Sequence, residues 1–245
     1  MAVKKYHCQR ASQPISIDGE ISDKVWDNTE WTDDFIDIRG DDHTKPRFRT
    51  RAKMMWDDTY FYIAAELEEP DVWGTLTEKN SIIYHDNDFE VFIDPDCDGL
   101  NYYEFEINAL GTIWELTLDK PYQDGGVADL GTNIDGLISK VSIDGVLNDP
   151  SHTDKGWKVE MAIPWGGLKK HHRYGVSPPK INDMWKLNFS RVQWHHEIVD
   201  GHYKRIPEHG TEIPWTEHPE DNWVWSPQGV INMHVPEMWG EIIFC

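Results

Sequence analysis

The sequence predicts an all-β fold, an antiparallel β-sandwich of jelly-roll type with long loops and little helix. Many short segments alternate apolar and polar residues, and turn-forming residues separate them at intervals of roughly 8–12 residues. Apolar residues at helical spacing are almost absent. No internal repeat or low-complexity linker interrupts the chain, so one domain is expected over residues 1–245.

The first part of the chain is expected to hold short strands and one turn of helix. A strand at residues 15–17 ends in an Asp-Gly turn, and residues 21–28 start with Ser-Asp, which is a helix-start signal. Further strands are expected at 31–38, 47–56 and 60–67. The last of these alternates most cleanly, with an apolar face of Phe61, Ile63, Ala65 and Leu67.

Residues 82–118 form the stretch around which the rest of the chain is organised. Strands are expected at 88–93, 102–109 and 112–118, with an acidic loop between the first two. The first two strands share an apolar face made of Phe89, Val91, Ile93, Tyr103, Phe105, Ile107 and Ala109. The third strand is apolar at Trp114, Leu116 and Leu118.

The second half is expected to contain strands at 156–163, 184–194 and 241–244 and one of uneven pattern within 136–147. In the strand 184–194 the alternation changes parity, because Phe189 and Val192 cannot share a face in a regular strand. This predicts a β-bulge, a feature that often lies beside a site. Residues 195–229 are expected to form a long functional loop.

The charge of the chain limits its partners. The formal net charge is −21, from 44 acidic and 23 basic residues, which argues against nucleic acid and against an anionic membrane surface. The 13 Trp residues suggest contact with sugar rings, although all-β cores also bury many aromatic rings. Polysaccharide or oligosaccharide is therefore the expected partner, and the oligomeric state is left open.

The three cysteines, Cys8, Cys97 and Cys245, are widely spaced and cannot form a complete disulfide framework. The N-terminus has no apolar segment typical of a signal peptide. Localisation stays open between the cytoplasm and export with the signal already removed.

An acidic face is expected on the hairpin of residues 88–109. Glu90 is predicted to lie near Glu104 or Glu106, with Asn108 close by. Like charges side by side on a sheet are unfavourable, so an Arg, a metal ion or a hydroxyl-rich ligand should compensate them. Arg191 is the expected internal partner, because guanidinium binds carboxylates in a bidentate manner. The alternative is a solvated face with spread charge.

The acidic loop between these strands could bind calcium, as a structural ion. Asp94, Asp96 and Asp98 resemble the first half of a calcium loop, but the Glu expected at position 12 is replaced by Phe105. The alternative is an acidic hairpin turn. The 12 His residues show no HxH or HExxH spacing, so solvated loop histidines are expected rather than a transition-metal site.

Several segments together resemble a known family. The segments IDGEISDKVW, WDDTYFYIAAEL, HDNDFEVFIDPDCDG, YYEFEINALGTIWEL, GWKVEMAIPW, LNFSRVQW and NWVWSPQG occur in the order seen in family 9 carbohydrate-binding modules. The resemblance is greatest to the stand-alone bacterial branch of that family. It covers nearly the whole chain and implies a β-sandwich that grips a sugar between two aromatic rings, with structural calcium.

The resemblance also implies roles for individual residues. Tyr84 matches the first clamp aromatic, where the best-studied type has Trp, and Glu90 matches the sugar-binding carboxylate. Glu106 and Asn108 match the polar strand that reads hydroxyl groups, although a basic residue is common at the position of Glu106. Arg191 and Gln193 are expected at the same site.

The second clamp ring should come from the late loop. Trp225 is the first choice there, followed by Trp223 and Trp215.

Three functions are consistent with these features. The leading one is non-catalytic binding of a sugar, as a glucan or xylan chain end or an oligosaccharide. The second is a carbohydrate-active enzyme, a glycoside hydrolase or lyase that uses the paired carboxylates of the acidic face. The third is a haem-binding module of the same superfamily, although no CxxCH motif is present.

Overall fold

The computed structural model describes residues 2–168, 178–207 and 220–245. The expected all-β sandwich is confirmed, because strands make up most of the regular structure and the helical elements are single turns. These turns are η1 (Lys24–Asn28), η2 (Ile83–His85), η3 (Tyr122–Asp124), α1 (Trp165–Leu168) and η4 (Pro236–Met238). No helix in the described part of the chain is both long and apolar enough to cross a membrane.

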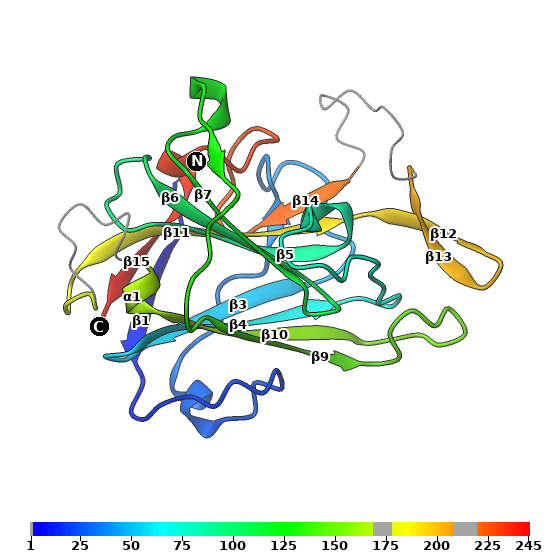
Figure 1. Cartoon of the computed structure of the whole chain (residues 1–245), viewed down its shortest axis with the longest axis horizontal. Coiled ribbons are helices and arrows are strands. Elements are labelled where there is room, and N and C mark those ends of the chain that lie inside the picture. Colours follow the sequence, from blue (N-terminus) through cyan, green and yellow to red (C-terminus); the bar gives the residue numbers. More distant parts are fainter. Residues whose placement is uncertain (1, 169–177, 208–219) are drawn as a thin grey trace.

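The strands form two layers that are joined by the first strand (Figure 1). In spatial order, the first layer contains β8 (Ala128–Asp129), β7 (Ile113–Leu118), β6 (Tyr102–Asn108), β5 (Asp88–Asp94), β11 (Met184–Gln193), β15 (Gly240–Phe244) and β1 (Lys5–Arg10). The second layer continues from β1 through β3 (Thr50–Trp56), β4 (Tyr60–Glu68), β10 (Gly156–Pro164) and β9 (Ile138–Asp144).

The sheet is mixed rather than wholly antiparallel. Strand β1 pairs in parallel with β15 through Lys5–Cys8 and in parallel with β3 through Gln9 and Arg10. All other strand pairs are antiparallel in the described residues. Strand β1 therefore passes from one layer to the other and closes one side of the sandwich.

The hydrophobic core lies between the two layers. Strands β5 and β6 contribute the predicted apolar face, from Phe89 to Ile93 and from Tyr103 to Ala109, and this face is almost fully buried. Strands β4 and β10 face them from the second layer with residues such as Ile63 and Met161. Because side chains alternate along a strand, the acidic residues of β5 and β6 must point away from this core.

The apolar residues of β7 lie on the outer face. Trp114, Leu116 and Leu118 pack with Phe92 and Trp239 in a second cluster outside the sandwich. Their neighbour Glu115 points inward instead and forms an ion pair of 2.6 Å with Lys79. This second cluster gives the outer face of β5–β7 an apolar border.

The bulge predicted in β11 is not found. The register of β11 with its partner strands runs without a skipped residue from Met184 to Gln193. Phe189 points into the core, and Val192 lies on the opposite face, where it borders a cavity. The alternation of apolar residues changes at this point because Val192 is an apolar residue on the outer face of a regular strand.

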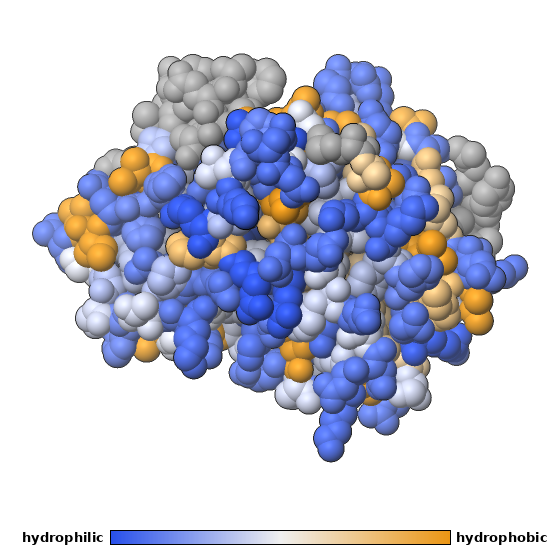
Figure 2. Space-filling model, turned by 180° about the vertical axis from the view of Figure 1, so that it is seen from behind, coloured by the Kyte–Doolittle hydropathy of each residue, from blue (hydrophilic) through white to orange (hydrophobic). Residues whose placement is uncertain are grey.

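The region 195–229, predicted to be a loop, contains strands where it is described. Strands β12 (His195–Val199) and β13 (His202–Ile206) form a separate hairpin, which extends to the right in Figure 1. Strand β14 (Asp221–Val224) pairs with β11 and with β2 (Ile36–Asp37). The side of the molecule opposite to Figure 1 is mainly hydrophilic, with scattered apolar patches (Figure 2).

Candidate functional site

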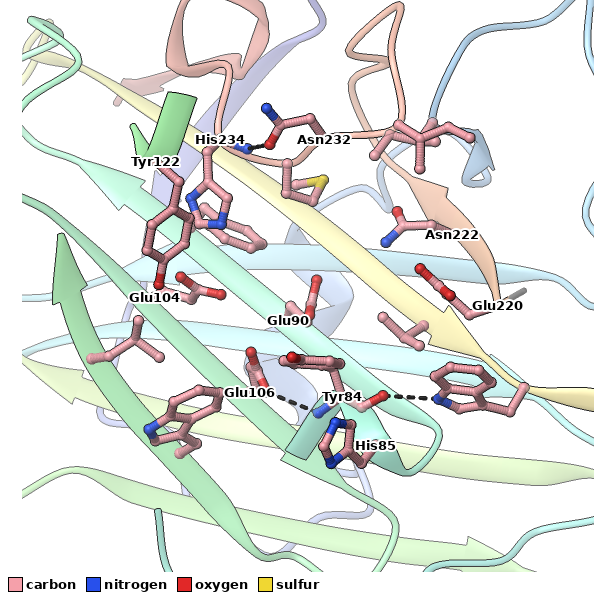
Figure 3. Close-up of a pocket in the computed structure, with 18 of the residues that line it drawn as sticks. Tyr84, His85, Glu90, Glu104, Glu106, Tyr122, Glu220, Asn222, Asn232 and His234 are labelled. Atoms are coloured by element: carbon pink, nitrogen blue, oxygen red, sulfur yellow. Dashed lines mark hydrogen bonds between the residues drawn. The ribbon is translucent and has the colours of Figure 1, made fainter. Parts of the chain in front are cut away.

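The floor of the site is the outer face of β5 and β6. Glu90 lies directly opposite Glu106 in the strand pair, and Glu104 is the diagonal neighbour on the same face. The predicted proximity of these side chains is therefore confirmed. Carboxylate oxygens of Asp88, Glu90 and Glu106 lie within 4.8 Å of one another. Figure 3 shows Glu90, Glu104 and Glu106 on the floor of a cavity, whereas Glu220 lies apart from them.

These acids are buried, and burial raises their pKa values. The pKa of Glu90 rises to about 7, mainly because burial disfavours the charged carboxylate. The pKa values of Glu104 and Glu106 rise well above the usual range, first through burial and then through the charge of Glu90. The floor is thus a group of carboxylates that would be stabilised by a ligand that donates hydrogen bonds or carries positive charge.

The carboxylates of the floor are only partly satisfied by the protein. Oε2 of Glu106 accepts a hydrogen bond of 2.9 Å from the backbone N–H of Tyr84, and Oδ1 of Asp88 accepts one of 3.1 Å from the backbone N–H of Val192. By contrast, one buried oxygen of each of Asp88, Glu90 and Glu104 accepts no hydrogen bond from the described residues. Such oxygens are uncommon in native proteins and call for an explanation.

Tyr84 forms one rim of the cavity from the short helix η2. Its side chain is 41 % exposed, and its backbone is fixed on both sides. The backbone N–H donates to Glu106, and the carbonyl accepts a 2.8 Å hydrogen bond from Nε1 of Trp194. The Tyr84 ring is 6.5 Å from that of Trp114 and inclined to it by 30°. A rigid, exposed ring therefore stands beside the acidic floor.

Tyr122 and His234 form the opposite rim (Figure 3). Their ring centroids are 4.6 Å apart in an edge-to-face arrangement. Nδ1 of His234 lies 2.8 Å from the hydroxyl oxygen of Tyr102. Burial lowers the pKa of His234 to about 4, so the ring is neutral at pH 7. This rim is aromatic and uncharged at that pH.

The cavity between the rims has a volume of about 530 Å³. Apolar side chains that include Val192 and Met233 line part of its wall, and Glu220 and Asn222 line another part. Arg205 is the one Lys or Arg among the described lining residues. Its guanidinium lies 4.1 Å from the ring centroid of Trp194 and donates to the carbonyl of His85. The cavity thus combines a polar floor with an aromatic and apolar wall.

Asn108, predicted to read hydroxyl groups, does not line this cavity. Its Nδ2 donates 2.9 Å hydrogen bonds to the Leu76 carbonyl and to Oδ2 of Asp86. Its Oδ1 accepts from the backbone N–H groups of Leu110 and Thr112. The side chain is fully buried and closes the turn after β6, so the structure gives it a supporting role.

Arg191 and Gln193 also lie away from the cavity. Both point from β11 toward the second layer and are almost completely buried. Nη2 of Arg191 is 3.3 Å from Oε2 of Glu69, and Nε2 of Gln193 donates to Oε1 of the same carboxylate at 2.7 Å. Arg191 is therefore not the partner of the acidic floor, because residues of odd number in this part of β11 face the core.

The late Trp residues expected to form the second clamp ring are core residues. Trp223 packs edge-to-face on Phe48, and Trp225 contacts Tyr6 and Phe189. Both are 2–3 % exposed. They are buried because β14 joins the sheet beside β11 and turns these rings inward. Trp215 lies outside the described residues.

The acidic loop after β5 is held by backbone donors. Asp94 is buried, and its carboxylate accepts hydrogen bonds from the backbone N–H groups of Asp96, Cys97 and Gly99. Asp98 is exposed and accepts from the backbone N–H of Leu100. In the described residues, the acids with metal-ligand spacing are those of the pocket floor and not those of this loop. Calcium in the loop stays a prediction.

The sequence did not identify most of the far side of the cavity. Tyr122, Trp194 and His234 come from three segments that are distant along the chain. Trp194 was part of a recognisable strand motif, so its aromatic type was a usable signal. Tyr122 and His234 lie in irregular segments, and no periodic pattern could place them beside Glu104.

Comparison with known proteins gives an independent indication of the family. Residues 17–198 match the family model described as "Carbohydrate family 9 binding domain-like". This range contains Tyr84, the floor residues Glu90, Glu104 and Glu106, and the neighbouring Asp88. It ends before Asn222 and His234, which complete the cavity wall.

Two curated relatives are enzymes that are much longer than this chain. The exoglucanase XynX of Acetivibrio thermocellus is 30 % identical over 152 residues, which is 62 % of this chain and 12 % of the enzyme. The endo-1,4-beta-xylanase A of Thermoanaerobacterium saccharolyticum is 31 % identical over 153 residues, which is 62 % of this chain and 11 % of the enzyme. The similarity therefore covers about a ninth to an eighth of each enzyme.

A solved structure has a similar fold. It is a family 9 carbohydrate-binding module from Caldicellulosiruptor kristjanssonii in complex with cellotriose. The TM-score is 0.58 at 19 % identity, over 98 % of this chain and 93 % of the other. A second structure of a family 9 carbohydrate-binding module from the same organism, in complex with glucose, gives a TM-score of 0.57, also at 19 % identity, over 99 % of this chain and 96 % of the other.

Proposed function

Because the chain belongs to the carbohydrate family 9 binding domain-like family, we propose that its cavity binds a sugar between Tyr84 and Tyr122, over the floor of glutamates. One observation carries this proposal. Buried carboxylate oxygens of Glu90 and Glu104 that accept no hydrogen bond from the described residues lie beside an exposed aromatic ring.

The chemistry of the cavity suits a pyranose. A carboxylate only accepts hydrogen bonds, and a sugar presents several hydroxyl donors on one ring. Hydrogen bonds to a charged acceptor are stronger than those between neutral groups. The C–H face of the sugar can pack on the ring of Tyr84, which is fixed by its backbone hydrogen bonds to Glu106 and Trp194.

The second aromatic wall is assigned to Tyr122 instead of Trp225. Tyr122 is 48 % exposed and lines the cavity, whereas Trp225 is in the core. A cavity of about 530 Å³ matches the size of small-molecule sites. The proposed ligand is therefore a chain end or a short oligosaccharide of the glucan or xylan class.

Calorimetric titration with cello- and xylo-oligosaccharides tests this proposal. Tyr84→Ala should weaken binding about tenfold or more, because it removes the stacking face. Tyr84→Phe should retain most of the affinity. Trp31→Ala is the control, since Trp31 is an aromatic residue that packs on Arg51 and Lys53, outside the cavity. If no sugar binds, or if Trp31→Ala weakens binding as much as Tyr84→Ala, the assignment of the site is wrong.

The same samples separate binding from catalysis. The floor carboxylates lie side by side on neighbouring strands and face the same side of any ligand. This arrangement favours reading of hydroxyl groups over attack from two sides of a glycosidic bond. Chromatography of the oligosaccharide after incubation should return it unchanged. If new products form and are absent with the Glu90→Gln variant, the protein is an enzyme and the proposal of binding alone is wrong. A Soret band in the absorption spectrum of the purified protein would indicate haem.

A further inference from the structure

The carboxylates of the floor point to more than hydrogen bonding. We infer that Asp88, Glu90 and Glu106 form a binding site for a divalent cation, Ca²⁺ by its ligand preference, at the acidic floor, where Glu90 and Glu106 line the cavity and Asp88 is fully buried beside them. The site is distinct from the acidic loop at Asp94–Asp98. The idea that the ion contributes to sugar binding rests on the proposed function. The ion site itself does not depend on that function.

Geometry supports a shared ion. Each of the three residues offers a carboxylate oxygen, and these oxygens lie within 4.8 Å of one another. Calcium binds oxygen ligands at 2.3–2.6 Å, so two ligands of one ion are at most about 5 Å apart. The three oxygens can therefore contact one ion without a change of the backbone. Strands β5 and β6 hold them, and strands are rigid supports.

Unsatisfied oxygens provide a second, independent observation. Oδ2 of Asp88, Oε2 of Glu90 and Oε2 of Glu104 are buried and accept no hydrogen bond from the described residues. The three side chains are at most 5 % exposed. A buried carboxylate without a partner lowers the stability of the folded protein, and several such carboxylates close together lower it further. A cation held by Asp88, Glu90 and Glu106 would give the Asp88 and Glu90 carboxylates the partner that the described residues do not supply.

In the described residues, no Lys or Arg side chain forms an ion pair with Asp88, Glu90 or Glu106, and the charge of Arg191 acts on Asp88 only from beyond ion-pair distance. Arg191 faces the core and pairs with Glu69. Arg205 lines the cavity but stacks on Trp194 and donates to the His85 carbonyl. Compensation of this acidic face is therefore left to bound protons, which the raised pKa values favour, or to a ligand that displaces them.

The donor set selects the type of ion. Three carboxylates without His or Cys favour a hard cation over zinc or copper. Calcium tolerates irregular geometry with 6–8 ligands, whereas magnesium requires a near-ideal octahedron. Three protein carboxylates leave positions free on the side of the cavity. Hydroxyl groups of a bound sugar can fill these positions, and the ion would then form part of the sugar site.

Titration of the chelator-treated protein, residues 1–245, with CaCl₂ tests the ion site without any sugar. We expect binding of one ion. Glu90→Gln and Glu106→Gln should each weaken calcium binding at least tenfold, because each replaces a charged carboxylate ligand by a neutral amide of similar shape. Asp98→Asn, in the acidic loop, should leave the affinity unchanged. Melting curves in chelator verify that each variant is folded.

The opposite results overturn the inference. It fails if the wild-type protein binds no calcium, or if Asp98→Asn abolishes binding while the floor variants retain it. It also fails if the chelator-treated protein binds glucosamine much more tightly than glucose and calcium does not compete with glucosamine. The ammonium group of the sugar would then be the cation that compensates the carboxylates.

A second titration, with oligosaccharide in calcium or in chelator, separates the two proposals. At least tenfold weaker sugar binding in chelator supports an ion within the sugar site. Equal affinity in both buffers overturns that link and leaves the calcium titration to decide the ion site. Calcium binding without any sugar binding contradicts the proposed function and supports the ion site alone.

Discussion

Two groups of buried polar side chains lie on opposite faces of the same layer, and they differ in how far the protein satisfies them. On the inner face, Glu69 accepts hydrogen bonds from Arg191, Gln193, Asn87 and Trp157, at 2.7–3.3 Å. On the outer face, Glu90 and Glu104 each keep a buried oxygen that accepts no hydrogen bond from the described residues. The inner group also contains a cation, and the outer group does not.

This difference separates a structural network from a site. A buried charge is tolerated when it is paired and hydrogen-bonded, and removal of one partner is then strongly destabilising. A buried charge that stays unpaired lowers stability and is retained where a ligand compensates it. The inner group therefore connects the two layers, and the outer group is available for binding.

The largest effect is expected when the inner network is broken. Glu69→Gln leaves the Arg191 guanidinium buried without its carboxylate, so it should lower the free energy of unfolding by about 3–5 kcal/mol. Urea denaturation at pH 7.5 measures this loss. A change below about 1 kcal/mol would mean that the ion pair contributes little and that the contrast between the two faces is wrong.

A smaller effect is expected from the neutral rim of the cavity, as pH is lowered. The pKa of His234 is lowered from its ordinary value near 6.5 to about 4 by burial. The unfolded state therefore binds a proton at His234 more readily than the folded state does. The free energy of unfolding keeps its full value above pH 6.5 and decreases as the pH falls toward 4. At pH 5 the loss should be about 2 kcal/mol.

The variant His234→Phe isolates this contribution. It removes the hydrogen-bond partner of the Tyr102 hydroxyl group at every pH, which adds a constant offset to the unfolding free energy. The difference in unfolding free energy between wild type and variant should therefore change between pH 7.5 and pH 5. A difference that is the same at both pH values would show that His234 titrates normally in the folded protein.

The smallest effect should have the opposite sign to the first. Glu90→Gln makes the same chemical change as Glu69→Gln, but it removes an uncompensated charge from the outer face. In chelator at pH 8 it should raise the free energy of unfolding by about 1 kcal/mol. The measurement uses the same urea titration. Destabilisation by Glu90→Gln would indicate that the protein itself compensates Glu90.

The fold could be predicted from sequence because its strands are short and regular. The alternation in β5 and β6 fixed which residues face the core, and the hairpin loop placed Glu90 near Glu106. The parallel pairing of β1 could not be predicted, because it joins the two ends of the chain and depends on the complete sandwich.

The site could be predicted only on its hairpin side. Tyr84, Glu90 and Glu106 are close along the chain, so local pattern placed them together. Arg191 and Trp225 were assigned by residue type, but strand parity and the pairing of β14 turn both away from the cavity. The rim residues Tyr122 and His234 meet only through tertiary structure.

A crystal structure of the protein with a bound cello- or xylo-oligosaccharide tests the central claim most directly. The account predicts a sugar ring on the face of Tyr84, with hydroxyl groups within hydrogen-bond distance of Glu90, Glu104 or Glu106. A sugar bound elsewhere, such as in the second cavity between Tyr103 and Gly167, with the glutamate floor empty, would contradict it.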